Sequence, residues 1–216
     1  MHVLTENARL LAGAFAMTAR LAGAAGLVAA VLGVLLAVAR LSPVSMLARS
    51  GSVYVETVRN TPVTVVFFLV VFVMPQIGVL IPSYSLAAIV ALGVYTAAFV
   101  CEAVRSGVNA VGRGQAEAAR ALGFSFAQGM RFVILSQALR AVVPPLANVW
   151  ITLVRTTSVA AGFGVVELTA AGRRINFLDP GGVVPALLWI AVAYLVMTLG
   201  SAGAFAILEN KLAAPR

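Results

Sequence analysis

The chain has 216 residues, of which 62% are hydrophobic and 10% are charged, and its formal net charge is +8. A soluble globular domain carries about 25% charged residues, so this composition excludes an ordinary water-soluble protein. Helices in a lipid bilayer can be apolar on every side, and a basic excess is typical of cytoplasmic loops rather than of nucleic-acid binding. The composition therefore predicts an all-α integral membrane protein in contact with the lipid bilayer, with no nucleic-acid partner.

The first transmembrane helix is predicted over residues 15–39, because about 20 apolar residues cross the hydrocarbon core of a bilayer. Gly23, Gly26 and Gly33 would allow a neighbouring helix to approach this span closely. Arg20 is expected near one end of the span, where its long side chain can reach the interface.

The second and third spans are predicted on either side of a short uncharged turn. Residues 40–60 precede them and contain three arginines and one proline, which indicates a cytoplasmic interfacial segment that is partly an amphipathic helix. The second span is predicted over residues 61–81, with Pro62 in its first turn, where proline is tolerated. The third span is predicted over residues 85–104.

The C-terminal half begins with a polar segment, residues 105–141, that contains five arginines. The fourth apolar stretch, 142–166, is interrupted by polar residues at 155–158, so we expect a broken or re-entrant span there. Residues 172–183 are predicted to form a loop, and the fifth span covers 184–208. About five transmembrane helices are therefore expected, all in a single transmembrane domain of residues 1–216.

The basic residues predict an orientation for these spans. Ten of the fifteen basic residues fall in the segments 40–60 and 105–141 and in the C-terminal tail. Cytoplasmic loops of membrane proteins collect arginine and lysine. This asymmetry predicts that the N-terminus lies outside and the C-terminus lies in the cytoplasm.

Residue types that most catalytic and metal sites need are scarce. Cys101 is the single cysteine and His2 the single histidine, so neither a multi-cysteine metal site nor a Ser-His-Asp triad can form within the chain. Lys211 is the only lysine, and its neighbours do not form the Gly-Lys-Ser/Thr sequence of a phosphate-binding loop. We therefore expect no metal site, no cofactor and no ATP hydrolysis in this chain.

Residues 112–146, GRGQAEAARALGFSFAQGMRFVILSQALRAVVPPL, predict a cytoplasmic helix-turn-helix. The first half consists of strong helix formers, and Gly123 permits a sharp reversal of the chain. Phe124 and Phe126 then offer apolar surface that must pack against another surface. An ordinary amphipathic helix that lies on the membrane or on its own bundle would also explain these features.

Glu117-Ala118-Ala119, then Gly123 and then Ile134-Leu135 resemble the EAA loop of ABC importer permeases, although Ser136 stands where that family usually has proline. The resemblance implies that residues 112–136 contain a short coupling helix that docks in a cleft of a cytoplasmic ATPase. The ATPase-coupling residues that it implies are Glu117, Ala118, Ala119, Arg120, Gly123, Phe124 and Phe126.

Three further segments resemble polar amino-acid permeases. Residues 58–62, Val-Arg-Asn-Thr-Pro, are similar to the Arg-Gly-Thr-Pro segment that opens the second core helix of that family. Residues 95–107 resemble its third-helix segment, and Arg-Thr-Thr-Ser at 155–158 stands where the family carries Lys-Asp-Thr-Ser. The Arg-Asn-Thr-Pro form and Ser-Pro-Val at 42–44 look closest to actinobacterial glutamate permeases. The chain is thus identified as a member of the permease subunits of polar amino-acid (histidine, glutamine or glutamate) ABC importers.

The resemblance implies the type I ABC importer permease fold and a role in moving a polar amino acid, with glutamate expected, across the plasma membrane of a bacterium. It implies three protein partners, which are a cytoplasmic ABC ATPase dimer, a second permease subunit of the same or a related chain, and an extracytoplasmic amino-acid-binding protein. ATP and magnesium would be bound by the ATPase.

Polar side chains within the spans are candidates for the substrate path, because charges inside a membrane usually face a cavity or a partner. A cation with hydroxyl groups in a broken helix could hold a substrate carboxylate, or it could reach the outer headgroups while the hydroxyls bond to backbone carbonyls. The other candidates could equally be packing residues, a structural ion pair with Arg105, or a helix cap. The candidates are Arg155, Thr156, Thr157, Ser158, Tyr95, Thr96, Glu102 and Thr61.

Two other classes of membrane protein are alternatives. A secondary transporter driven by an ion gradient would show pseudo-repeated halves or carboxylates at mid-depth, whereas the sequence has no evident repeat and Glu102 is expected near an interface. A membrane-embedded enzyme would need clustered acid, base or metal-binding groups, and the seven acidic residues are scattered.

Overall fold

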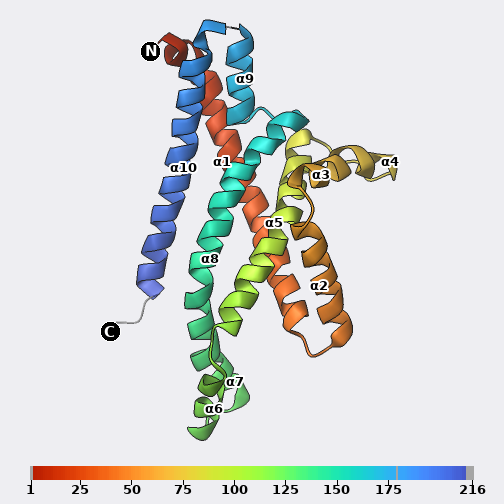
Figure 1. Cartoon of the computed structure of the whole chain (residues 1–216), viewed down its shortest axis with the longest axis vertical. Coiled ribbons are helices and arrows are strands. Elements are labelled where there is room, and N and C mark those ends of the chain that lie inside the picture. Colours follow the sequence, from red (N-terminus) through yellow and green to blue (C-terminus); the bar gives the residue numbers. More distant parts are fainter. Residues whose placement is uncertain (1, 179, 213–216) are drawn as a thin grey trace.

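The computed structural model describes residues 2–178 and 180–212, without the side chains of residues 2–5, 113, 126 and 180. Four long helices run roughly along one axis, namely α1 (His2–Leu41), α5 (Tyr84–Asn109), α8 (Leu135–Thr156) and α10 (Val183–Leu212) (Figure 1). The described chain has four helices long and apolar enough to cross a membrane, or up to five if one bent pair counts as a span. The prediction of an all-helical membrane fold with about five spans agrees with this architecture.

The predicted second span is not one straight helix. α2 (Ser45–Arg59) runs back along α1, and α3 (Val63–Phe68), the π-helical turn η1 (Leu69–Val73) and α4 (Met74–Gln76) project sideways from the bundle (Figure 1). The two parts are bent by 106°. Pro62 lies at this bend, and because it has no backbone N–H it cannot continue the helix of α2. Helical structure covers Val63–Gln76 within the predicted span of 61–81, but it forms one bent pair with α2, which is the interfacial helix predicted within 40–60.

The α1 helix is longer than predicted and packs closely on its neighbours. A Cβ atom added to Gly33 would lie 2.5 Å from the Cβ of Val100 on α5, and one added to Gly26 would meet the ring of Trp150 on α8. A Cβ atom added to Gly23, by contrast, would meet no neighbouring helix within 4 Å. Glycine thus permits the close contacts expected at Gly26 and Gly33, because its missing side chain lets two helices approach. Arg20 lies near the middle of α1, not near its end.

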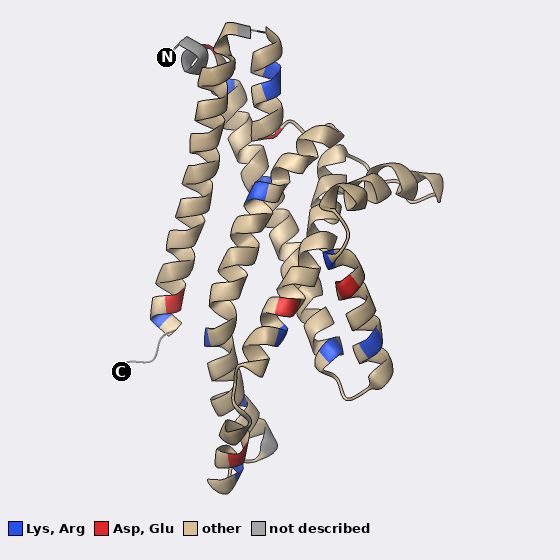
Figure 2. Ribbon diagram, in the orientation of Figure 1, with Lys and Arg blue, Asp and Glu red and all other residues tan. Residues whose placement is uncertain are grey.

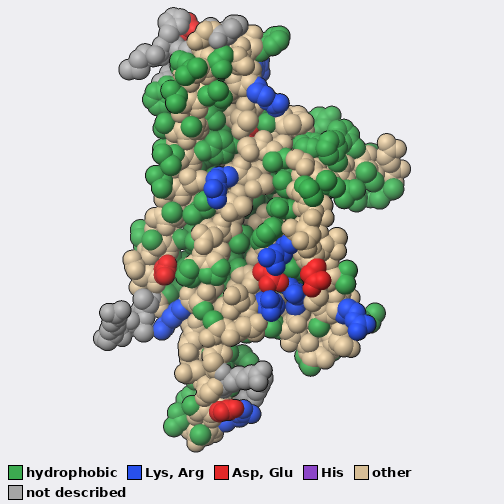
Figure 3. Space-filling model, in the orientation of Figure 1, with side chains coloured by type: hydrophobic (Ala, Val, Ile, Leu, Met, Phe, Trp, Pro, Cys, Tyr) green, Lys and Arg blue, Asp and Glu red, His purple; other side chains and the backbone are tan. Residues whose placement is uncertain are grey.

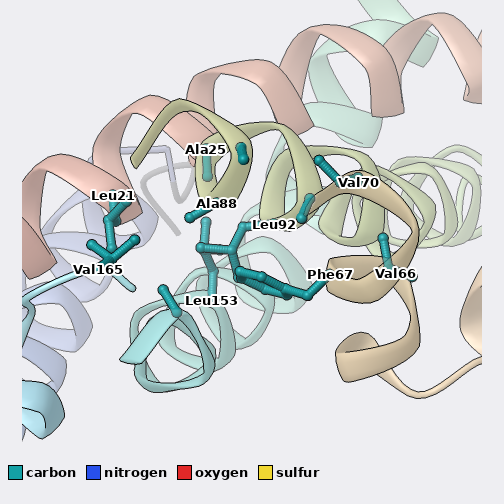
Figure 4. Close-up of a cluster of buried hydrophobic side chains, with 12 residues drawn as sticks. Leu21, Ala25, Val66, Phe67, Val70, Ala88, Leu92, Leu153 and Val165 are labelled. Atoms are coloured by element: carbon teal, nitrogen blue, oxygen red, sulfur yellow. The ribbon is translucent and has the colours of Figure 1, made fainter. Parts of the chain in front are cut away.

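A hydrophobic core joins the sideways arm, which consists of α3, η1 and α4, to the bundle of long helices (Figure 4). Leu21 on α1, Phe67 on α3, Leu92 on α5 and Leu153 on α8 all point into it, and all four are buried. Phe67 also stacks on Phe163, with ring centroids 4.9 Å apart. This packing holds the base of the sideways arm against the long helices.

The α8 helix (Leu135–Thr156) starts earlier than the predicted stretch of 142–166 and ends within it. The π-helical turn η2 (Gly129–Ile134) leads directly into α8, and α8 continues into a 3-10 helix, η3 (Thr157–Phe163). The interruption expected at 155–158 corresponds to this change of helix type. Pro144 and Pro145 lie inside α8. Just before them, Val142 packs closely on Gly107 of α5, because a Cβ atom added to Gly107 would lie 3.0 Å from the backbone N of Val142.

The predicted loop at 172–183 is wrong. This stretch contains most of α9 (Leu168–Leu178) and the 3-10 turn η4 (Pro180–Gly182). Leu168, Ala171 and Ile175 recur every three or four residues and are buried, so α9 has an apolar face that packs on α1 and α10. The arginines at 173 and 174 made the segment look polar, although they lie outside this buried face.

Candidate functional site

A short helical hairpin forms the end of the molecule opposite α9 (Figure 1). It consists of α6 (Arg113–Ala121), a turn, and α7 (Phe126–Gln128), which leads into η2. Gly123 has a φ of 82°, a left-handed conformation that glycine adopts without strain. The Gly123 N–H donates to the Arg120 carbonyl at 2.9 Å, and the Phe124 N–H donates to the Ala119 carbonyl at 3.1 Å. These two bonds close a Schellman turn, so the reversal predicted at Gly123 is present.

The hairpin presents most of its predicted coupling residues to the outside. Glu117, Ala118 and Arg120 are exposed, whereas Ala119 is buried against Gly129 of η2. A groove of about 400 Å³ lies beside the contact of α6 with η2, and its lining residues are Ala116, Ala119, Arg120, Phe124, Ser125, Gly129, Met130 and Ile134. Gly123 and Phe124 are also exposed, and the side chain of Phe126 lies outside the described part of the structure.

A second hollow, of about 320 Å³, lies between α3, α5 and α8. It is lined by Val63, Tyr95, Thr96, Phe99, Asn148, Val149, Thr152, Leu153 and Thr156. Every residue in this lining is uncharged, and five of them carry a hydroxyl or amide group. The hollow can therefore offer hydrogen bonds to a small polar solute within an otherwise apolar bundle.

The structure brings three of the eight substrate-path candidates, Tyr95, Thr96 and Thr156, into this hollow. The others do not line it. Thr157 is buried and donates its hydroxyl to the Val154 carbonyl at 2.7 Å, and Thr61 donates to the Thr57 carbonyl at 2.8 Å. Arg155 is exposed, Ser158 is half-buried, and Glu102 belongs to the ion cluster described below.

Sequence reasoning missed Asn148 and Thr152, which line the same hollow. A periodic signal for them exists, because Asn148, Thr152 and Thr156 are spaced four residues apart and so share one face of α8. The Thr156 hydroxyl donates to the backbone carbonyl of Thr152 at 2.8 Å, which holds the Thr156 side chain against the preceding turn.

Charged side chains gather between α5 and α2 (Figures 2 and 3). Glu102 on α5 lies at the centre of this ion cluster, which also contains Arg40, Arg59 and Arg105. Arg40 donates to Glu102 Oε1, Arg105 Nη2 donates to Oε2 at 3.0 Å, and Arg59 Nη1 is 3.8 Å from Oε1. The pair of Glu102 and Arg105 expected from their spacing is present, and the cluster ties α1, α2 and α5 together.

A buried acidic residue at the other end of the molecule was not predicted. Glu167 is fully buried, and its Oε2 accepts a hydrogen bond from the Tyr194 hydroxyl at 2.6 Å. Its Oε1 accepts from the Ala170 N–H at 2.9 Å, so Glu167 caps the first turn of α9. An acidic residue inside an apolar run was the available signal, since such residues in membrane proteins have partners.

Within the described residues, no group of three or more His, Cys, Asp or Glu side chains is placed to hold a metal ion. The features of the described residues that can serve a function are the exposed hairpin, the neutral hollow, the ion cluster and the buried Glu167.

Comparison with known proteins identifies a family that matches most of this chain. Residues 29–214 match the family described as binding-protein-dependent transport system inner membrane component. The chain is 34% identical over 217 residues to the probable glutamine ABC transporter permease protein GlnM of Bacillus subtilis, covering 98% of this chain and 90% of that protein. It is 36% identical over 199 residues to the glutamate transport system permease protein GluC of Corynebacterium efficiens, covering 86% of each.

A solved structure is similar over nearly the whole chain. It is a crystal structure of an amino acid ABC transporter with histidines, with a TM-score of 0.88, 29% sequence identity, and coverage of 96% of both chains. The overall arrangement of the helices is thus one that an experimental structure also has.

Proposed function

Because the chain belongs to the family of binding-protein-dependent transport system inner membrane components, we propose that it carries glutamate across the plasma membrane of a bacterium. At the coarser level, it is a multi-pass inner-membrane permease subunit of an ABC importer for polar amino acids. A permease component is not itself an ATPase and binds no cofactor, so nucleotide chemistry takes place on another chain.

The observation that carries the proposal is the hairpin of α6 and α7, which projects beyond the long helices (Figure 1). Its exposed residues include Glu117, Ala118 and Arg120, and the groove beside it is open. A short rigid helix of this kind can dock in a cleft of a cytoplasmic ATPase dimer. Closure of that dimer on ATP would push on α6, and α6 is joined through η2 to α8, which lines the hollow.

The binding-protein-dependent class supports the remaining partners that we propose. An extracytoplasmic amino-acid-binding protein delivers the solute, and a second permease subunit, the same or a related chain, completes the path. The N-terminus lies outside and the C-terminus in the cytoplasm, so α9 is extracytoplasmic and the α6 hairpin is cytoplasmic. This orientation rests on the basic residues, most of which lie at the hairpin end of the chain's spans.

Glutamate is supported by the relatives and by the hollow. The named relatives divide between glutamine and glutamate permeases. Five of the nine residues that line the hollow carry a hydroxyl or amide group and none of the nine is acidic, so the hollow would not attract a cationic amino acid. The substrate-path residues that we assign are therefore Tyr95, Thr96 and Thr156, with Asn148 and Thr152 added.

Uptake by the reconstituted transporter tests this function. We expect proteoliposomes that hold the permease, its ATPase and its binding protein to accumulate radiolabelled glutamate only with internal ATP. Glu117→Lys reverses an exposed charge on α6, and Gly123→Pro removes the left-handed turn residue, so each should reduce uptake at least tenfold. Glu209→Lys reverses an exposed charge on α10 and serves as the matched control. Uptake that survives ATP depletion, or normal uptake in both α6 variants, would refute the proposal.

A further inference from the structure

Among the α5 residues that line the hollow, Phe99 lies nearest the C-terminal end of that helix, which leads to the α6 hairpin. Tyr95 and Phe99 lie one helical turn apart on α5, with ring centroids 5.1 Å apart. The guanidinium carbon of Arg59 lies 5.8 Å from the centroid of the Phe99 ring. A cation at this distance over an aromatic face is electrostatically attracted to it. Arg59 is thus placed at the edge of the hollow, although it belongs to the last turn of α2.

Arg59 is the loosest member of the ion cluster. Arg40 and Arg105 each donate a hydrogen bond to Glu102, one to each carboxylate oxygen. The contact between Arg59 and Glu102, at 3.8 Å, is too long for a hydrogen bond. The Arg59 side chain is 45% exposed, compared with 11% for Arg40. Arg59 can therefore bind another anion without losing a hydrogen bond to Glu102. Arg40 and Arg105 would each have to break such a bond.

The charges of the cluster favour an anion beside Arg59. Three arginines face one carboxylate, so the cluster carries a positive excess at the end of a neutral hollow. Guanidinium groups bind carboxylates through two parallel hydrogen bonds, and such bonds are stronger in a site that is partly shielded from water. An amino acid in the hollow needs a cationic partner for its α-carboxylate, and the lining residues supply none.

We infer that Arg59 is a carboxylate subsite at the hairpin end of the hollow, and that it receives the α-carboxylate of the amino acid. The inference rests on the proposed function, because it assumes that an amino acid occupies the hollow. The substrate side chain lies among the hydroxyl and amide groups of α5 and α8, while the α-carboxylate lies over the edge of Phe99. Glu102 is a positioning residue, which holds Arg59 at that edge by its longer-range attraction.

Equilibrium binding measures this subsite directly. The intact complex of permease and ATPase is purified in detergent, and binding of radiolabelled glutamate and of radiolabelled glutamine is measured without nucleotide. Loss of one charge-assisted contact in Arg59→Gln should weaken the binding of both amino acids about tenfold, because both have the α-carboxylate. Arg59→Lys keeps the charge without the fork of donors and should lose less.

Arg49→Gln is the matched control, because it removes one exposed arginine from the same helix, α2. We expect this variant to bind both amino acids as the wild type does. Wild-type binding in Arg59→Gln would overturn the inference, and so would a loss confined to glutamate, which would mean that Arg59 contacts the side chain instead. If Arg59→Gln does not assemble, Arg59→Lys decides, since a purely structural arginine would lower stability without changing the affinity.

The two proposals fail in different ways. If the wild-type complex neither binds nor transports a polar amino acid, the proposed function is wrong. If the wild type binds and transports, and Arg59→Gln is indistinguishable from it, only the subsite is wrong.

Discussion

Glu167 is completely buried and accepts two hydrogen bonds, and these bonds determine its contribution to the stability of the fold. A buried carboxylate is costly unless its oxygens are satisfied. Both oxygens accept hydrogen bonds, from Tyr194 on α10 and from the backbone of Ala170 on α9. The neighbouring Leu168 N–H donates to the Thr18 hydroxyl on α1 at 3.2 Å. One short segment therefore fastens α9 to both α1 and α10.

Truncation of this acid should destabilise the protein. Glu167→Ala leaves the Ala170 N–H without its acceptor and leaves the Tyr194 hydroxyl with only the Thr169 hydroxyl at 3.2 Å, which we expect to cost about 1–3 kcal/mol. Glu167→Gln keeps one acceptor and nearly the same volume, so it should cost less. Thermal unfolding of the detergent-purified complex measures both. Equal unfolding temperatures for the alanine variant and the wild type would contradict this role.

The packing of α1 on α5 shows how helices associate where lipid removes the usual hydrophobic drive. Small residues let the two backbones approach, and close van der Waals contact then stabilises the pair. Gly33 fits against Val100, and a side chain at Gly33 has no free volume to enter. Gly23 on the same helix is exposed and has open space beside it.

This difference gives a matched pair of substitutions. Gly33→Val should force α1 away from α5 and cost about 1–3 kcal/mol, as overpacking does in other close-packed interiors. Gly23→Val adds the same side chain to the same helix at an open position and should be close to neutral. The amount of folded protein recovered by size-exclusion chromatography distinguishes them. Similar yields would show that the α1–α5 contact tolerates expansion.

Several elements could be predicted from the sequence, and others could not, for identifiable reasons. Apolar runs of sufficient length located α1, α5 and α10, because the thickness of a bilayer sets that length. The bend at Pro62 could not be predicted, because the sequence indicates two separate segments at 40–60 and 61–81. In the structure, the helices of these segments form one bent pair. The α9 helix was missed because its buried face, with Glu167 before it, depends on contacts with α1 and α10 that no local pattern reveals.

Some features of the candidate site could likewise be predicted from the sequence, and others could not. The turn at Gly123 and the pair of Glu102 and Arg105 follow from local spacing, and the structure has both. The hollow depends on how α3, α5 and α8 meet, so the sequence placed Arg155 and Thr157 in the substrate path on chemical type alone. The position of Arg59 over Phe99 likewise results from the fold of α2 against α5.

At the scale of the whole molecule, its two ends differ in character. The end with α9 is joined to α1 and α10, and the end with α6 extends beyond the long helices (Figure 1). Phe177 near the end of α9 is 88% exposed, and Leu122 after α6 is 76% exposed. If the proposed orientation is right, these two residues lie on opposite sides of the membrane.

Cysteine labelling tests that orientation. In intact cells, a membrane-impermeant maleimide should label Phe177→Cys but should label Leu122→Cys only after the membrane is broken. The native Cys101 is buried and gives little background. The reverse labelling pattern would show that the chain is inserted with the opposite orientation.

The course of α8 has a mechanical consequence. Pro144 and Pro145 interrupt its hydrogen-bond ladder, and just before them Val142 presses on Gly107 of α5. Counted from Pro144 at about 1.5 Å per helical residue, Ile134 in the groove is about 15 Å away and Thr156 in the hollow is about 18 Å away. With nearly equal arms about a pivot, a tilt imposed at the groove would displace the solute-facing end by a similar distance in the opposite direction.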